Sequence, residues 1–123
     1  METKTSTRRT IASPEFAFRN KLGFLAVQFK SQGQLARLLE VDRSRISRWL
    51  KAETPDAENR TKVEALEFVL SRLTTFLSIE TARKWLMGIN AHLGDRRPID
   101  LLRRGRVAEV IAAIEQFEGG SYT

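Results

Sequence analysis

The chain has 123 residues, a formal net charge of +6 and no cysteine. That length suits one domain, or two small helical subdomains that share a core. Hydrophobic residues make up 41% of the chain, which is too many for a disordered protein. The absence of cysteine excludes thiolate metal sites, and the single histidine excludes the His clusters of catalytic metal sites. No nucleophile–base set is evident either, so we expect no metal, no cofactor and no enzymatic activity.

The positive charge is concentrated in the first half of the chain. Residues 1–51 carry 11 Lys/Arg and 4 Asp/Glu, a formal charge of +7, whereas residues 52–123 carry 10 and 11, a formal charge of −1. This asymmetry predicts that the N-terminal half meets a polyanion and the C-terminal half meets something else. No apolar run approaches the ~20 residues of a membrane span. The first ten residues do not resemble a secretory signal, and we expect a cytoplasmic protein with no membrane partner.

Taken in chain order, the first half predicts a mobile arm and three helices. Residues 1–13 are polar and charged without periodicity, which indicates a flexible arm. Ser13 is a candidate N-cap with Pro14 at the first helical position. The apolar residues that mark the inner faces of the three helices are Phe18, Leu22, Leu25 and Phe29, then Leu35, Ala36, Leu38 and Leu39, then Ile46, Trp49 and Leu50.

The second half predicts longer helices. Asp56 follows a Thr-Pro break and is a candidate N-cap, and Ser78 is a second one. Two apolar stripes follow these caps, namely Val63, Leu66, Leu70, Leu73 and Leu77, then Ile79, Ala82, Leu86, Ile89 and Leu93. Residues 98–104 fit a short helix closed by Gly105, and a last helix over Val107, Val110, Ile111 and Ile114 is expected to end at Gly119-Gly120.

No segment alternates with period two, so we expect an all-α fold. We divide it into the arm at 1–13, an N-terminal helical subdomain at 14–54 that contains a candidate helix-turn-helix, and a C-terminal helical subdomain at 55–123.

A helix-turn-helix is predicted by the two short helices between residues 32 and 53. With Ile46, Trp49 and Leu50 facing inward, about 100° of rotation per residue turns the polar positions of the second helix outward. Asp42 is placed as its N-cap. We expect Arg43, Ser44, Ser47 and Arg48 near DNA bases, and Gln32, Arg45 and Lys51 near phosphates. The alternative is that these arginines are only the solvated face of an amphipathic helix.

The stretch Gln32–Glu53 resembles the Xre-type DNA-binding motif, from Leu35-Ala36 through Val41 to Ile46-Ser47-Arg48-Trp49. Glu40 departs from it, because this turn position is commonly glycine in that family. A left-handed conformation costs a non-glycine residue about 1–2 kcal/mol, so an altered turn is a second possibility here.

The most informative stretch is Asn90–Gly105. Asn-x-x-Leu-Gly leads into Pro-x-x-Leu-Leu and then a glycine, carried here by Asn90, Leu93, Gly94, Pro98, Leu101, Leu102 and Gly105. Local physics requires only a helix–turn–short-helix connector, with Gly94 and Gly105 as C-caps. The full combination, downstream of a helix-turn-helix, resembles the Xre/MbcA/ParS-type antitoxin family. The resemblance implies an antitoxin that neutralises a RES-domain, NAD-consuming toxin by occluding its active site, and that represses its own operon.

The resemblance also implies which residues contact the toxin. They are Asn90, Gly94, Arg96, Arg97 and Pro98 in the module, and Gly119, Gly120, Ser121, Tyr122 and Thr123 in the tail. The alternative for the tail is a frayed chain end. Arg96, Arg97, Arg103, Arg104 and Arg106 form a second basic group, which we interpret first as a solvated rim. Trp85 is interpreted as core.

A homodimer is expected because Phe68, Val69 and Phe76 fall off the main apolar stripe and need cover. A dimer also presents two recognition helices to a palindromic operator. Two other interpretations stay open at this point. One is a transcriptional regulator without a toxin partner, and the other is a toxin-binding protein whose helix-turn-helix serves only as scaffold.

Overall fold

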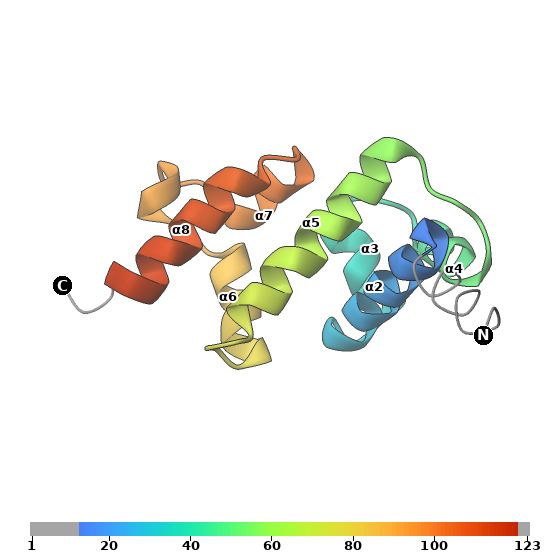
Figure 1. The fold of residues 1–123 in the computed structure, drawn as a ribbon, viewed down its shortest axis with the longest axis horizontal. Helices are drawn as coiled ribbons and strands as arrows, with labels where there is room; N and C mark the ends of the chain where they lie inside the picture. The colour runs from blue at the N-terminus through green and yellow to red at the C-terminus, as the bar shows by residue number, and fades with distance from the viewer. Residues whose placement is uncertain (1–12, 121–123) are drawn as a thin grey trace, which may run out of the picture. The chain divides into compact units, whose positions relative to one another are not determined.

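The structure, a computed structural model, describes residues 13–120. Seven α-helices, α2 to α8, and one short 3-10 helix, η1, lie in this range, and it contains no β-strand (Figure 1). The expected all-α fold is confirmed for the described residues. No helix in this range is both long and apolar enough to cross a bilayer.

The chain divides into two compact units, one up to Glu64 and one from Ala65. This division falls inside α5 (Ala57–Leu73), so that helix belongs partly to each unit. The predicted subdomain boundary at residues 54 and 55 lies just ahead of α5 and stays a prediction.

Helix α2 (Pro14–Gln28) forms as its sequence predicts. The Ser13 hydroxyl accepts a hydrogen bond from the Phe16 amide at 3.2 Å, which satisfies one of the orphan donors of the first turn. Phe18, Leu22 and Leu25 are buried, as is Phe29 just past the helix end. Both α3 (Gln32–Leu39) and α4 (Arg43–Lys51) pack against this helix and against each other.

The turn between α3 and α4 is built around a left-handed residue. Glu40 has φ 61° and ψ 47°, and the Val41 amide donates to the Ala36 carbonyl at 3.0 Å. With the Glu40 amide donating to Arg37, this is the Schellman pattern that usually uses glycine. The possibility of an altered turn is therefore wrong. Glutamate adopts the left-handed conformation that the turn requires.

Helix α4 turns its apolar side inward. Ile46 and Trp49 are fully buried, whereas Leu50 is only half-buried. The edge of the Trp49 ring packs against Phe18 of α2, with the centroids 6.3 Å apart. Asp42 occupies the N-cap position as expected, but its side chain makes no capping hydrogen bond.

Helix α5 is capped by Asp56, whose carboxylate accepts from the Asn59 amide at 3.3 Å. The expected stripe Val63, Leu66, Leu70 and Leu73 is buried. Leu77 lies beyond the helix, which ends at Leu73. Val69 is also buried, so the expectation that it lies off the main stripe and needs a partner chain is wrong. A wider apolar stripe than one heptad seam accounts for this, because core-facing helices bury an arc of about 100° or more.

The unit from Ala65 continues with α6 (Ile79–Met87), η1 (Ala91–Leu93), α7 (Pro98–Arg103) and α8 (Val107–Gly120). Ser78 caps α6 by accepting from the Thr81 amide at 3.2 Å, as predicted. The predicted stripe continues too far, however, because α6 ends at Met87 and Ile89 is 73% exposed.

Gly119 and Gly120 also differ from expectation, since α8 includes both glycines instead of ending before them. Glycine permits many conformations, and a helical one costs only about 1 kcal/mol relative to alanine. Two glycines therefore do not by themselves end a helix.

Candidate functional site

Most of the predicted DNA-contacting side chains gather at one hollow on the first unit. The open hollow, of about 490 Å³, is lined by Gln32, Arg43, Ser44, Ser47 and Arg48. Gln32 begins α3 and the other four belong to α4. Because Ile46 and Trp49 anchor the inner face of α4, its remaining polar positions turn outward. The lining contains two arginines, two hydroxyls and one amide, which are groups that donate hydrogen bonds to phosphate oxygens and base edges.

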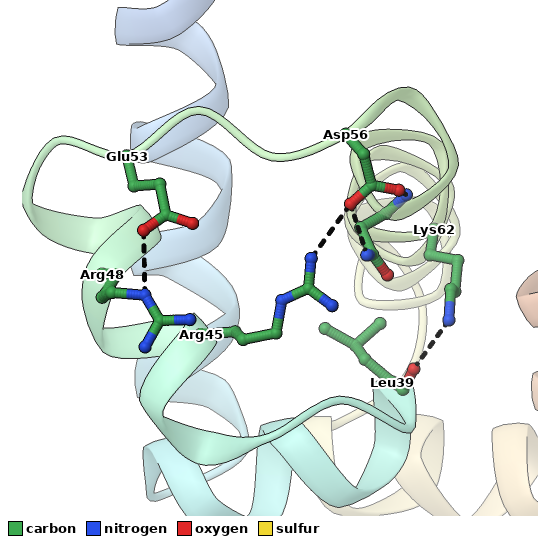
Figure 2. Close-up of polar contacts among 7 residues, drawn as sticks. Leu39, Arg45, Arg48, Glu53, Asp56 and Lys62 are labelled. Carbon is green, nitrogen blue, oxygen red and sulfur yellow. Dashed lines mark hydrogen bonds and ion pairs between the residues drawn. The ribbon is translucent and has the colours of Figure 1, made fainter.

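Arg45 and Lys51 are placed differently. The Arg45 guanidinium lies 5.2 Å from the centroid of the Trp49 ring. It also pairs with Asp56 at 3.1 Å (Figure 2). This arginine connects α4 to the start of α5, away from the lining of the hollow. Lys51 is exposed at the C-terminal end of α4 and is not part of the lining either.

Three side-chain contacts around this surface were not predicted from the sequence. Glu53 accepts a hydrogen bond from Arg48 Nε at 2.8 Å, and Asp56 binds Arg45 (Figure 2). Lys62 of α5 donates to the Leu39 carbonyl at 3.1 Å, at the end of α3, where a helix leaves carbonyls without intrahelical partners. The only sequence signal was the placement of two acidic residues, Glu53 and Asp56, shortly after a run of cations.

Asp56 is the polar centre of the connection between α4 and α5. Its Oδ1 accepts from Asn59 Nδ2 at 2.7 Å as well as from Arg45. The hydrogen bond from the Asn59 side chain, assisted by the Asn59 amide and the Arg45 charge, lowers the pKa of this carboxyl below its ordinary value. The Asp56 carboxylate therefore stays ionised, and able to pair with Arg45, to a lower pH than an unperturbed carboxyl would.

In the second unit, Asn90 organises the turn that follows α6. Its side chain accepts from the His92 amide at 2.9 Å, and its backbone pairs with Arg96 in an isolated antiparallel bridge. Gly94 and Asp95 both adopt the left-handed conformation, with φ 67° and 62°. The expected C-cap role of Gly94 is confirmed, and Gly105, with φ 76°, likewise follows α7. The Asn90–Gly105 motif is therefore first of all a set of local backbone requirements.

Four arginines of the basic group in this unit are paired with two acidic residues. Asp100 accepts a bidentate pair from Arg97, with both distances 3.0 Å, and a further bond from Arg103 at 2.9 Å. Glu109 binds Arg96 at 3.2 Å and also Arg106. The hydrogen bonds from Arg97 in particular hold the pKa of Asp100 below its ordinary value. These arginines therefore brace α7 and the start of α8, and much of their charge is compensated locally.

The other residues predicted to contact a toxin are distributed as follows. Arg96 is exposed, Asn90 and Arg97 are half-buried, and Pro98 is buried at the start of α7. Gly119 and Gly120 form the end of α8. Ser121, Tyr122 and Thr123 lie outside the described residues, as does most of the predicted 1–13 arm.

An aromatic cluster lies beside this end of α8. Phe117 contacts Phe76 and Trp85, with ring centroids 5.9 and 6.3 Å apart. All three rings are partly exposed, so Trp85 is not the fully buried core residue that the sequence predicted. Phe68, on α5, is 54% exposed. Apolar side chains at the surface of this unit are consistent with protein–protein contact.

Comparison with known proteins identifies antitoxins as relatives of this chain. Matches include the Mycobacterial cidal antitoxin MbcA of Mycobacterium tuberculosis and of Mycobacterium bovis. Each is 28% identical over 78 residues, which is 63% of this chain and 69% of the relative. No protein-family model and no solved structure matches the chain. The similarity supports an antitoxin assignment.

Proposed function

We propose that this chain is the antitoxin of a toxin–antitoxin pair, acting in the cytoplasm on a RES-domain toxin that consumes NAD. The observation that carries the proposal is the similarity to an antitoxin over 69% of that protein's length. The Asn90–Gly105 stretch supports it, because its residues resemble the motif of the Xre/MbcA/ParS-type antitoxin family. Inhibition in this proposal is steric, since the chain occludes the toxin's NAD-binding cleft and carries out no reaction itself.

The toxin-binding surface is proposed to lie on the second unit. Arg96 and the accessible parts of Asn90, Gly94 and Arg97 lie on one turn, and Pro98 supports that turn from inside. Gly119 and Gly120 form the end of α8, and residues 119–123 are proposed to reach the toxin's active site. Tyr122 offers an aromatic side chain with a polar tip, which suits a protein–protein contact.

The first experiment co-expresses the chain with the product of the adjacent gene. A stable complex that stops NAD loss is expected, because occlusion requires direct contact. A chain shortened by residues 119–123 is expected to inhibit less while retaining its DNA binding. A chain carrying Glu115→Gln, a substitution on the exposed face of α8, serves as the matched control for changes near the tail. No complex and no effect on NAD would contradict the antitoxin proposal, and unchanged inhibition by the shortened chain would contradict the role of the tail.

We further propose that α3 and α4 form a helix-turn-helix that binds operator DNA. The hollow supports this, because its lining combines Arg43 and Arg48 with the hydrogen-bonding side chains Gln32, Ser44 and Ser47. Lys51, at the exposed end of α4, is proposed to contact the DNA backbone. A homodimer joined through exposed apolar residues such as Phe68 would present two such surfaces to a palindromic operator.

Binding to the chain's own promoter at several salt concentrations tests this second activity. Each phosphate that the protein neutralises is expected to contribute about −0.9 to the slope of log affinity against log salt. The hollow equally favours a transcriptional regulator without a toxin partner, which would bind the promoter but form no complex with the neighbouring protein. A toxin-binding protein whose helix-turn-helix is only scaffold would form the complex with the neighbouring protein but would not bind the promoter.

A further inference from the structure

Two arginines of α4 have acidic partners outside that helix, and the two pairs differ in kind. Arg45 lies over the Trp49 ring and binds Asp56, so it is a structural connection within the first unit. Arg48 donates to Glu53 through Nε at 2.8 Å, yet its side chain is 51% exposed and lines the hollow. Arg48 therefore combines an acidic partner with a place on the proposed DNA-binding surface (Figure 2).

The atom used in this contact determines what the guanidinium can still offer. An arginine has five N–H donors in a rigid fork, and one edge of the fork includes Nε while the other edge consists of the two Nη groups. Glu53 binds at Nε. The edge formed by the two Nη groups can donate two parallel hydrogen bonds, which is the pattern that reads O6 and N7 of guanine.

We propose that Glu53 is a specificity-determining residue of the DNA-binding surface. It positions Arg48 by holding Nε, so that the two Nη groups meet a guanine edge, and its negative charge opposes binding where that guanine is missing. This inference rests on the DNA-binding part of the proposed function. Glu53 acts through Arg48 and does not itself contact DNA.

The ion pair between Arg48 and Glu53 is not explained by a contribution to the stability of the fold. The Glu53 side chain is 46% exposed, and ion pairs between side chains this exposed contribute little to folding. Binding is more sensitive, because one bidentate arginine–guanine contact discriminates against a wrong base by about 5- to 150-fold. A carboxylate close to phosphates also weakens sequence-independent attraction, since that attraction depends on local positive charge.

The test uses the full chain and a duplex selected by the wild-type protein from a random library. Affinities for this duplex and for a scrambled duplex are measured for the wild type, Glu53→Ala, Glu53→Gln and Glu58→Ala. Glu58 is the matched control, because it is an exposed acid on the first turn of the neighbouring helix α5 and its replacement removes the same charge. Far-UV circular dichroism and a thermal melt check that each variant folds.

Glu53→Ala is expected to bind the scrambled duplex more tightly and to lower the ratio of specific to scrambled affinity by about tenfold. Glu53→Gln keeps an oxygen that accepts from Nε, so an intermediate ratio is expected. Glu58→Ala is expected to change both affinities together and to leave the ratio unaltered. In an Arg48→Ala background, Glu53→Ala is expected to have no further effect on the ratio, because no arginine remains to be positioned.

The results that would overturn the role of Glu53 differ from those that would overturn DNA binding itself. If the wild type selects a duplex and Glu53→Ala retains the wild-type ratio, the role of Glu53 is overturned while DNA binding stands. If Glu53→Ala still lowers the ratio of specific to scrambled affinity in the Arg48→Ala background, the role of Glu53 is also overturned, since Glu53 would then act through another group. If the wild-type chain binds no DNA, the DNA-binding part of the proposed function fails and this inference fails with it.

Discussion

At the scale of single residues, Glu40 illustrates how a tertiary requirement overrides a local preference. The turn between α3 and α4 needs the Val41 amide to reach the Ala36 carbonyl, and the geometry places Glu40 at φ 61°. A residue with a Cβ is strained there by about 1–2 kcal/mol. Leu35 of α3 and Ile46 of α4 are both fully buried, so the packing of the two helices offsets the strain of the turn.

This strain predicts that Glu40→Gly is more stable than Glu40→Ala by about 1 kcal/mol. Both variants remove the glutamate side chain and its interactions, so their difference isolates the backbone. Glycine is more flexible in the unfolded chain, which reduces the gain. Urea denaturation followed by circular dichroism measures the difference. Equal midpoints for the two variants would show that the left-handed conformation is not strained in this turn.

At the scale of secondary-structure elements, glycine lowers the stability of the fold inside one helix and raises it at the end of another. Gly23 lies inside α2, and a Cβ built on it would meet no atom within 4 Å. Gly94 follows η1 with φ 67°, where a Cβ would have room but the backbone conformation would be strained. The role of each glycine therefore depends on the backbone of its element and not on the space around it.

We accordingly expect Gly23→Ala to raise the free energy of unfolding by about 0.5–1 kcal/mol, since alanine is the better helix former. Gly94→Ala is expected to lower it by about 1–2 kcal/mol through its positive φ. Chemical denaturation of the two variants beside the wild type gives both values. Changes of the same sign would contradict this account of the two backbones.

At the scale of the whole molecule, the uneven charge of the sequence is sharpened by the local ion pairs. Residues 1–51 carry a formal charge of +7, and the hollow on α4 exposes part of it. In the second half, Asp100 and Glu109 each bind two arginines, so the positive charge of these four side chains is partly compensated where they lie. Attraction of a polyanion is therefore expected at the first unit.

The same ion pairs predict a loss of stability in acid. The pKa of Asp100 in the folded chain lies below its ordinary value of 3.8, because Arg97 and Arg103 favour the ionised carboxylate. This contribution is fully present above the ordinary value and is lost as pH falls through the lowered one. Asp56, whose pKa is also lowered, adds a contribution of the same sign.

Asp100→Asn is therefore expected to be less stable than the wild type at neutral pH and to approach it below about pH 4. Thermal melts between about pH 3 and pH 7 measure the difference. Glu115→Gln, on the exposed face of α8, controls for the loss of one negative charge. A difference between Asp100→Asn and the wild type that does not shrink in acid would show that the ion pairs are not its source.

The sequence by itself determined the class of fold, because its signals there are local. Apolar spacing and caps at Ser13, Asp56 and Ser78 predicted helices that the structure confirms, since a hydroxyl or carboxylate that satisfies the first amides acts within one turn. Outward placement of Ser44 and Arg48 likewise followed from the apolar face of one helix. The left-handed conformations of Gly94 and Gly105 were predictable for the same reason.

Only the tertiary structure decided which charged groups meet. The sequence predicted phosphate contact for Arg45 and base contact for Arg48, but it did not predict their acidic partners. Arg45 binds Asp56 and lies over Trp49, while Arg48 lines the hollow beside Glu53. The sequence also predicted that Ile89 belongs to the buried apolar stripe of α6 and that Val69 lies off the stripe of α5. In the structure Ile89 is exposed and Val69 is buried. Long side chains reach several ångströms across a packed helix pair, so their partners depend on how the helices and the connection to α5 are arranged. Helical periodicity contains no information about that arrangement.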